Sequence, residues 1–144
     1  MRLLTVTLIT FFCWGVSHAE TKSVDVYSAN LRSSPSTTAS YVVLQVPKNY
    51  PLMVLESTEE FYKVSDFVDR TGWIHKSIVG DSAGVVVVKK IVNLRKGPGI
   101  DHEITCKVEK GVAFEVIKEQ EDWLEVLHDS GKRGWIYKKL VWGI

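Results

Sequence analysis

The sequence predicts a chain of two small β-strand modules that arose by duplication of one unit. The tripeptide Gly-Trp-Ile occurs at 72–74 and 134–136, and Asn-Leu-Arg occurs about forty residues earlier in each copy, at 30–32 and 93–95. The copies are offset by 63 positions at the first tripeptide and by 62 at the second, so one residue was gained or lost between them. A repeat of this length defines the unit that folds and binds.

Each copy contains a run in which apolar residues alternate with others. At an offset of 62 the aligned pairs are Val42 with Ile104, Leu44 with Cys106 and Val46 with Val108. This period of two is typical of a half-buried strand. Asn49 aligns with Gly111, and both residue types tolerate a left-handed backbone, so we expect a tight turn after the strand in both copies. The extra residue of the first copy is expected in the loop after Pro35 and Pro98.

Residues 1–19 have the pattern of a cleaved signal peptide. Arg2 is followed by an apolar run from 3 to 16, and Ala19 ends the segment with a small residue suited to signal peptidase. The run is about fourteen residues long, whereas a spanning helix needs roughly twenty. We therefore predict an exported protein that begins at Glu20 and has no transmembrane anchor in its mature chain.

The remaining chain divides into modules at 20–83 and 84–144. Lys and Arg number 6 against 8 acids in the first module and 11 against 9 in the second, which gives net charges of −2 and +2. This balance argues against nucleic acid as a partner. The link from Gly80 to Gly84 spans at most about 18 Å, so we expect the modules to touch or to be restricted in their mutual orientation.

The sequence indicates no enzyme, no cofactor and no metal site. Once the leader is removed Cys106 is the single cysteine, and its counterpart Leu44 marks a core position, so a buried, inert thiol is expected. No group of His, Cys, Asp or Glu recurs in both copies at metal-ligand spacing. Acidic pairs at 59–60 and 121–122 do recur, but neighbours along the chain before a strand are typical of turns facing water. We also expect His128 to lie at a surface or rim, because its counterpart is Asp66.

The second copy resembles the bacterial SH3-like domain along its whole length. The resemblance rests on the segments 93–99 (Asn-Leu-Arg-Lys-Gly-Pro-Gly), the alternating strand, a Lys-Gly turn at 110–111, Trp-Leu-Glu-Val at 123–126 and Gly-Trp-Ile at 134–136. The first copy keeps Asn-Leu-Arg and Pro35 but has Ser34 where the family pattern has glycine. If that position needs a positive φ, the first loop is strained or differently shaped.

This resemblance implies an all-β protein: two tandem small SH3-like β-barrels, each strongly bent and built of five to six short strands, after a cleaved signal peptide. Members of the family lie outside the cytoplasm and commonly bind cell-wall peptidoglycan or envelope proteins, often beside a hydrolase domain. The resemblance therefore implies an exported protein of the periplasm or cell envelope, or one that is secreted.

Aromatic residues are the strongest candidates for ligand contact, because flat faces with a polar edge suit glycan rings and peptides. Strand parity places Tyr62 in the core and turns Phe61 and Trp123 away from it, toward either a ligand or the other module. Trp73 and Trp135 serve either the core or a ligand. The aromatic candidates are Trp73, Trp135, Tyr137, Phe61 and Trp123.

Two arginines, Arg32 and Arg95, complete the candidate set. Each could clamp a carboxylate of a peptide stem bidentately. Each could also bridge its own loop to an acid such as Glu59 or Glu121, and this loop role is the favoured interpretation.

Two functional classes remain open from the sequence. The first is a non-catalytic envelope protein that binds peptidoglycan or its stem peptides. The second is a periplasmic adaptor that docks an extended peptide segment of a partner protein. On a polymer with repeating epitopes, two weak sites on a short link reinforce each other.

Overall fold

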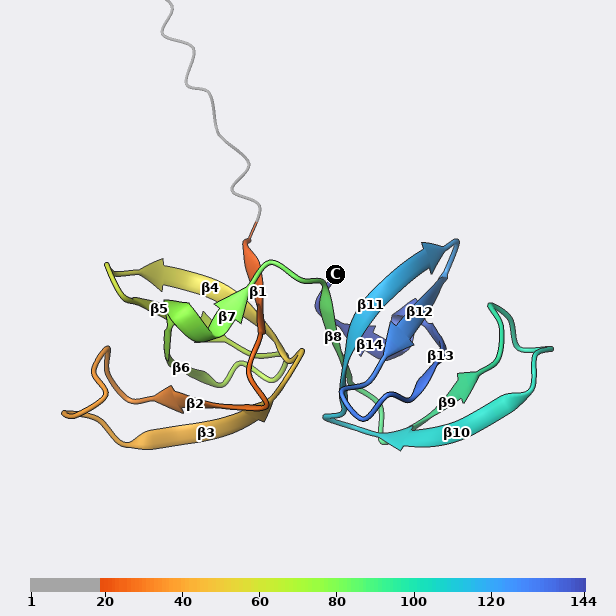
Figure 1. Ribbon diagram of the computed structural model, residues 1–144, viewed down its shortest axis with the longest axis horizontal. Coiled ribbons are helices and arrows are strands. Elements are labelled where there is room, and N and C mark those ends of the chain that lie inside the picture. Colours follow the sequence, from red (N-terminus) through yellow and green to blue (C-terminus); the bar gives the residue numbers. More distant parts are fainter. Residues whose placement is uncertain (1–18) are drawn as a thin grey trace, which may run out of the picture.

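A computed structural model describes residues 19–144, so residues 1–18 of the predicted leader lie outside the described part of the chain. The described chain forms two antiparallel sheets of seven strands (Figure 1). The first sheet has the order β3-β2-β6-β5-β4-β1-β7 and the second has the order β10-β9-β13-β12-β11-β8-β14. The first sheet consists of β1 (Thr21–Val24), β2 (Ser28–Arg32), β3 (Val42–Pro47), β4 (Pro51–Ser57), β5 (Phe61–Ser65), β6 (Thr71–His75) and β7 (Val79–Gly80). The second consists of β8 (Gly84–Val87), β9 (Ile91–Arg95), β10 (Ile104–Glu109), β11 (Ala113–Gln120), β12 (Trp123–Leu127), β13 (Arg133–Tyr137) and β14 (Val141–Trp142).

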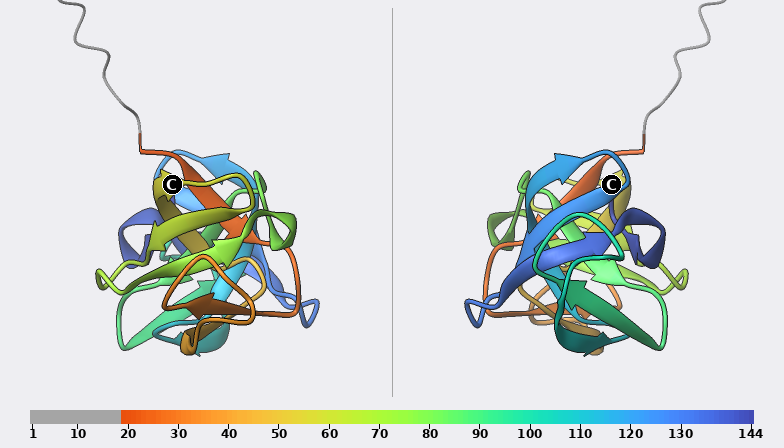
Figure 2. Two further views of the ribbon diagram at one scale, coloured as in Figure 1. Left: turned by 90° about the vertical axis from the view of Figure 1, so that its left-hand side faces the viewer. Right: turned by 90° about the vertical axis from the view of Figure 1, so that its right-hand side faces the viewer.

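Both sheets are curled, as the end-on views in Figure 2 show. The prediction of an all-β chain with two repeated modules is confirmed, since the two sheets have the same strand order. Each sheet has seven strands rather than five to six. The strands β7 and β14 contain two residues each and follow a single 3-10 turn, η1 (Lys76–Ile78) or η2 (Lys138–Leu140). Strands this short leave no periodic pattern in a sequence, which explains the undercount.

The alternating runs form β3 and β10, as predicted, but their first residues do not face the core. Val42 is 47% exposed and Ile104 is 41% exposed. A register shift lies between Leu31 and Arg32 opposite β3 and between Ile104 and Cys106 in β10. Such a bulge adds one residue to the strand and turns the preceding side chains away from the inner face.

Cys106 packs against the core of the second module, as its counterpart Leu44 does in the first. Both side chains are only half-buried, so the expectation of a fully buried thiol was too strong. The two residues lie on edge strands, β3 and β10, where no neighbouring strand covers the outer side.

The tight turns after β3 and β10 have the backbone that the sequence predicted. Asn49 has a φ of 65° and Gly111 a φ of +91°. The extra residue of the first copy lies in the predicted loop, which spans 33–41 in the first module and 96–103 in the second.

The glycine of the family pattern in that loop is needed for space and not for a positive φ. Neither Ser34 nor Gly97 is among the residues with positive φ, so the backbone strain that a positive φ would bring at Ser34 is absent. At Gly97 a Cβ would instead overlap the ring of His102. The two loops therefore differ in packing, because the first module has no ring at that place.

The repeated Gly-Trp-Ile is explained by close packing of neighbouring strands. A Cβ on Gly72 would lie 2.8 Å from Cβ of Leu31, and one on Gly134 would lie 2.6 Å from Cγ of Leu94. Each glycine thus lets the leucine of Asn-Leu-Arg fill the core beneath the strand that carries the tryptophan.

The two modules are in contact through strand β8. Its side chains alternate between two cores: Val85 and Val87 belong to the core of the second module, whereas Val86 belongs to the core cluster of the first. All three are fully buried. Ala113 of β11 joins the same first-module cluster, and Trp142 packs against it. The core of the first module is therefore completed by residues of the second.

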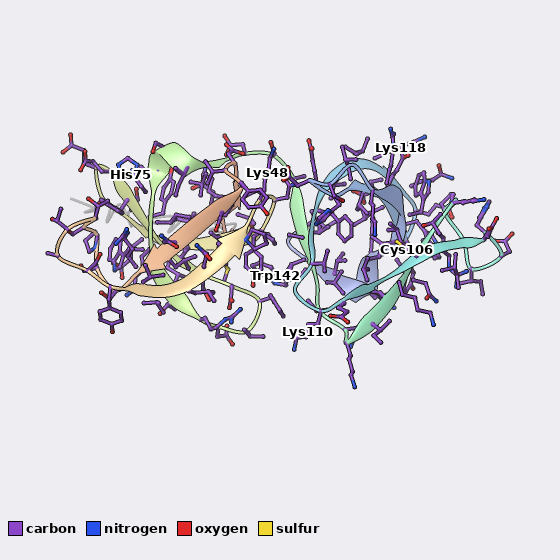
Figure 3. The ribbon with its side chains drawn as sticks, turned by 60° about the horizontal axis from the view of Figure 1, so that its bottom comes forward. Lys48, His75, Cys106, Lys110, Lys118 and Trp142 are labelled. Atoms are coloured by element: carbon purple, nitrogen blue, oxygen red, sulfur yellow. The ribbon has the colours of Figure 1, made fainter. Side chains whose placement is uncertain are left out.

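Charged and aromatic contacts surround this apolar junction. Lys48 forms an ion pair with Asp129 at 3.3 Å. The ammonium of Lys110 lies 5.7 Å from the ring centroid of Phe67. Figure 3 shows Lys48, Lys110 and Trp142 near the boundary between the modules. These contacts agree with the restricted orientation expected from the short link.

Asp66 occupies the position in the first module that His128 occupies in the second, and its carboxylate is buried. The prediction that this position lies at a surface or rim is therefore wrong for the first module. The Asp66 side chain is fully buried. It accepts hydrogen bonds from Nε of Arg70 at 2.7 Å and from the hydroxyl of Tyr50 at 3.2 Å. Burial, and then the charge of Asp66, raise the pKa of Tyr50 to about 12, so the phenol stays protonated and donates. Burial alone would raise the pKa of Asp66, but the hydrogen bonds from Arg70 and from the backbone of Val68 hold it below its usual value.

We expect Asp66→Asn to lower the free energy of unfolding at pH 7 by about 1 to 3 kcal/mol. Because the folded pKa of Asp66 is lowered, its contribution is present above the unfolded pKa and is lost as the pH falls through the folded one. The difference in the free energy of unfolding between wild type and variant, measured from urea unfolding curves, should therefore shrink below about pH 4. Asp69→Asn is the matched control, since Asp69 is exposed and asparagine tolerates its φ of 62°. A pH-independent difference would contradict the assignment.

Candidate ligand-binding grooves

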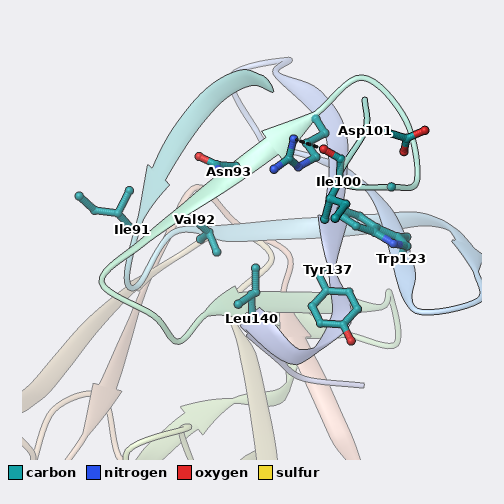
Figure 4. A pocket seen from close by; sticks show the side chains of 10 residues that line it. Ile91, Val92, Asn93, Ile100, Asp101, Trp123, Tyr137 and Leu140 are labelled. Atoms are coloured by element: carbon teal, nitrogen blue, oxygen red, sulfur yellow. Dashed lines mark hydrogen bonds between the residues drawn. The ribbon is translucent and has the colours of Figure 1, made fainter. Parts of the chain in front are cut away.

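A cavity on the second module is called the module-2 groove (Figure 4). Its volume is about 590 Å³. Trp123 begins β12 and Tyr137 ends β13, and the two residues pair across these strands with ring centroids 5.5 Å apart. The groove thus has an aromatic pair at one end. Its lining residues are Ile91, Val92, Asn93, Arg95, Gly99, Ile100, Asp101, Trp123, Tyr137 and Leu140.

The first module has a groove at the equivalent place, here called the module-1 groove, with a volume of about 440 Å³. Phe61 takes the place of Trp123, and His75 takes the place of Tyr137. Their rings meet edge to face with centroids 5.0 Å apart. The remaining lining residues are Val26, Ser28, Ala29, Asn30, Arg32, Thr37, Ser77 and Ile78. Two sites of the same construction are therefore present in one chain.

Both candidate arginines line their grooves and hold their own loops. The guanidinium of Arg95 donates from one nitrogen to the carbonyl oxygens of Ile100 at 3.0 Å and His102 at 2.9 Å. Arg32 donates to the hydroxyl of Ser40 at 3.3 Å. The favoured loop role thus has a structural basis, although the acceptors are carbonyls and a hydroxyl and not Glu59 or Glu121. In the second module this clamp fixes the loop that forms one wall of the groove.

Trp73 and Trp135 line neither groove. They stand in register with Arg32 and Arg95 in the neighbouring strands, on the face of β6 and β13 opposite to buried Ile74 and Ile136. They belong to neither core cluster and are half-buried. Of the seven candidates, the structure therefore groups Trp123, Tyr137 and Arg95 in one groove and Phe61 and Arg32 in the other.

Phe61 and Trp123 do not lie at the junction between modules, which was the alternative left open for them. Phe61 is 6% exposed and packs against His75, and Trp123 packs against Tyr137. Tyr62 packs against the first core, as its strand parity predicted. The inter-module role is taken instead by β8, Ala113 and Trp142.

Among the lining residues that sequence reasoning did not single out are His75, Ile100 and Asp101. His75 could have been found from the repeat, since it aligns with the candidate Tyr137. Ile100 and Asp101 lie in the loop where the two copies differ in length, so no alignment marks them.

The recurring acidic pairs occupy turns, as expected. Glu59, Glu60, Glu121 and Asp122 are all exposed in the β4–β5 and β11–β12 turns. Residues 19–144 contain no group of three or more metal-ligating side chains. Within the same range no helix has the length and apolar character needed to cross a membrane.

Comparison with protein families identifies the fold of both modules. One bacterial SH3 domain model matches residues 28–79, and a second matches residues 88–143. The chain belongs to the bacterial SH3 domain family and carries two such domains in tandem.

Relatives include larger proteins. A candidate N-acetylmuramoyl-L-alanine amidase, YrvJ of Bacillus subtilis strain 168, is 32% identical over 65 residues, which is 45% of this chain and 12% of that protein. An NlpC/P60 family protein from Bacillus cereus ATCC 10987 is 14% identical with a TM-score of 0.42, covering 85% of this chain and 56% of the other. NlpC2 from Trichomonas vaginalis is 10% identical with a TM-score of 0.40, covering 89% and 49%. The chain thus spans about an eighth of the curated relative and about half of the two structures.

Proposed function

We propose that this chain is a non-catalytic, exported binding protein of the bacterial cell envelope that holds peptidoglycan or its stem peptides in its two grooves. The observation that carries the proposal is the repetition of one groove, with an aromatic pair and an arginine, at the same place in both modules. A polymer with repeating epitopes is the ligand that such a duplication suits. Export rests on the pattern of residues 1–19.

The composition of the grooves supports a glycopeptide or peptide ligand. Trp123 and Tyr137 offer ring faces and polar edges, while Ile91 and Leu140 offer apolar surface along the same groove. Such a surface binds through apolar contact, and a few polar groups set the orientation. The Bacillus subtilis relative is named for N-acetylmuramoyl-L-alanine, in which an amino sugar derivative is joined to an amino acid. That name supports the same class of ligand here.

Co-sedimentation with purified insoluble cell wall tests the proposal. We expect the mature chain to sediment with the wall and to be released by soluble muropeptide. Trp123→Ala should weaken this binding about tenfold or more, because it removes half of the aromatic pair. Tyr41→Ala is the matched control, since Tyr41 is 71% exposed and lines neither groove. Failure of the wild type to sediment, together with capture of a specific envelope protein, would favour the adaptor alternative.

A further inference from the structure

The two grooves differ in one charged group. The module-2 groove includes Asp101, whereas none of the residues that line the module-1 groove carries a carboxylate. The corresponding loop of the first module supplies Thr37 instead. The grooves therefore share their aromatic and arginine positions but differ in their charge at the loop wall.

The carboxylate of Asp101 is available to a ligand. The other acid of its loop, Glu103, forms an ion pair with Lys96 at 2.7 Å. Asp101 takes part in none of the ion pairs formed within residues 19–144. Arg95, the basic residue that lines the same groove, uses one guanidinium nitrogen for two loop carbonyls. This clamp also holds the Gly99–Asp101 wall in place.

The aromatic pair of the same groove is free of cations. In the first module the ammonium of Lys76 lies over the ring of Tyr62 at 4.8 Å from its centroid, and Lys110 lies over Phe67. In the described chain no lysine or arginine lies over Trp123 or Tyr137. Figure 4 shows Asp101 on the loop at the same end of the groove as Trp123. An open carboxylate and open aromatic faces thus line one pocket.

This combination has a definite chemical preference. A carboxylate accepts charge-assisted hydrogen bonds from an ammonium group, and aromatic faces attract cations within about 6 Å of the ring centroid. Ile91 and Leu140 extend the groove with apolar surface that suits the methylene chain of an amine. An N-acetylated sugar offers hydroxyl and amide donors but no ammonium group, so it could not form an ion pair with Asp101.

We propose that the module-2 groove selects a ligand with a primary ammonium group on an apolar chain, held between Asp101 and the Trp123–Tyr137 pair. This inference rests on the proposed function. Within the cell wall, the group that matches is the side-chain amine of a diamino acid in a peptide stem. The module-1 groove has no such preference, because it lacks the carboxylate.

A pair of soluble probes tests the preference directly. Nα-acetyl-lysine N-methylamide carries the amine, and Nα-acetyl-norleucine N-methylamide has the same shape without it. Titrations of the full mature chain are followed by NMR through the indole N–H of Trp123. We expect the lysine probe to bind about tenfold more tightly than the norleucine probe. Asp101→Asn should remove this difference and leave the norleucine affinity unchanged.

Glu103→Gln is the matched control, since it removes the same charge from the same loop but at a residue that pairs with Lys96 and lines neither groove. It should keep the preference for lysine. Retention of the preference in Asp101→Asn, or its equal loss in Glu103→Gln, would overturn the proposal.

A second arm separates this inference from the proposed function. Wall whose amines have been acetylated with acetic anhydride is compared with untreated wall in the sedimentation assay. We expect acetylation to weaken binding of the wild type and to have no effect on Asp101→Asn. Equal binding of the wild type to both walls would refute amine selection while leaving wall binding intact. Failure to bind untreated wall would instead contradict the proposed function, and the soluble probes would still decide the inference.

Discussion

Val86→Asp should destabilise both modules at once, by about 3 to 5 kcal/mol. Val86 lies on a strand of the second sheet, yet it is fully buried in the core cluster of the first module. An aspartate there would be a buried charge without a partner. Since domains of this size are stable by roughly 5 to 15 kcal/mol, most of the stability would be lost.

Thermal and urea unfolding, each followed by circular dichroism and by tryptophan fluorescence, measure this effect. Val43→Asp is the matched control, because Val43 lies on strand β3 but is 46% exposed. We expect it to change the free energy of unfolding by less than about 1 kcal/mol. A normally stable Val86→Asp protein, or one in which only a single module loses structure, would contradict the shared core.

Disruption of one groove should weaken binding to insoluble wall far more than binding to soluble muropeptide. His75 and Tyr137 occupy equivalent positions in the two grooves, so His75→Ala and Tyr137→Ala form a matched pair. If both grooves engage one polymer, loss of either one removes the avidity, which is on the order of 10² to 10⁴ in affinity. A muropeptide with one stem uses one groove at a time and should lose only the affinity of the altered groove.

Sedimentation with wall and titration with muropeptide, for wild type, both single variants and the double variant, separate these effects. Equal losses for wall and muropeptide would show that avidity is absent. Whole-chain variants are needed for this comparison. A cut between Ala83 and Gly84 removes Val86 and Ala113 from the first core, so separated modules would lose stability as well as a second groove.

The repeat predicted much of what the structure contains. It predicted two β modules, the equivalent strands in which Leu44 aligns with Cys106, the turns at Asn49 and Gly111, and the loop that holds the extra residue. These features depend on local chain geometry, which alternation and turn residues report directly. The arginines recur in both copies. The rings of Phe61, Trp123 and Tyr137 were recognised as candidates by their residue type.

Other features depend on how segments of the folded chain meet. The bulges that turn Val42 and Ile104 outward depend on the register of β2 with β3 and of β9 with β10. The buried Asp66 depends on Arg70, which meets it across a turn, and on Tyr50, which is 16 residues away in the sequence. The sequence left open whether Gly97 serves a positive φ; it makes room instead for His102, a neighbour that only the folded loop brings close.

The sequence by itself therefore determined the number of modules, their strand class and the residue types of the grooves. The tertiary structure decided how those residues group: Trp123 and Tyr137 lie with Asp101 in one groove, whereas Trp73 and Trp135 lie outside both. It also decided that Val86 packs in the core of the other module. Alternation shows that a side chain leaves a strand on one face, but not which segment packs against that face. That choice follows from the packing of the two curled sheets, in which both faces of β8 are buried.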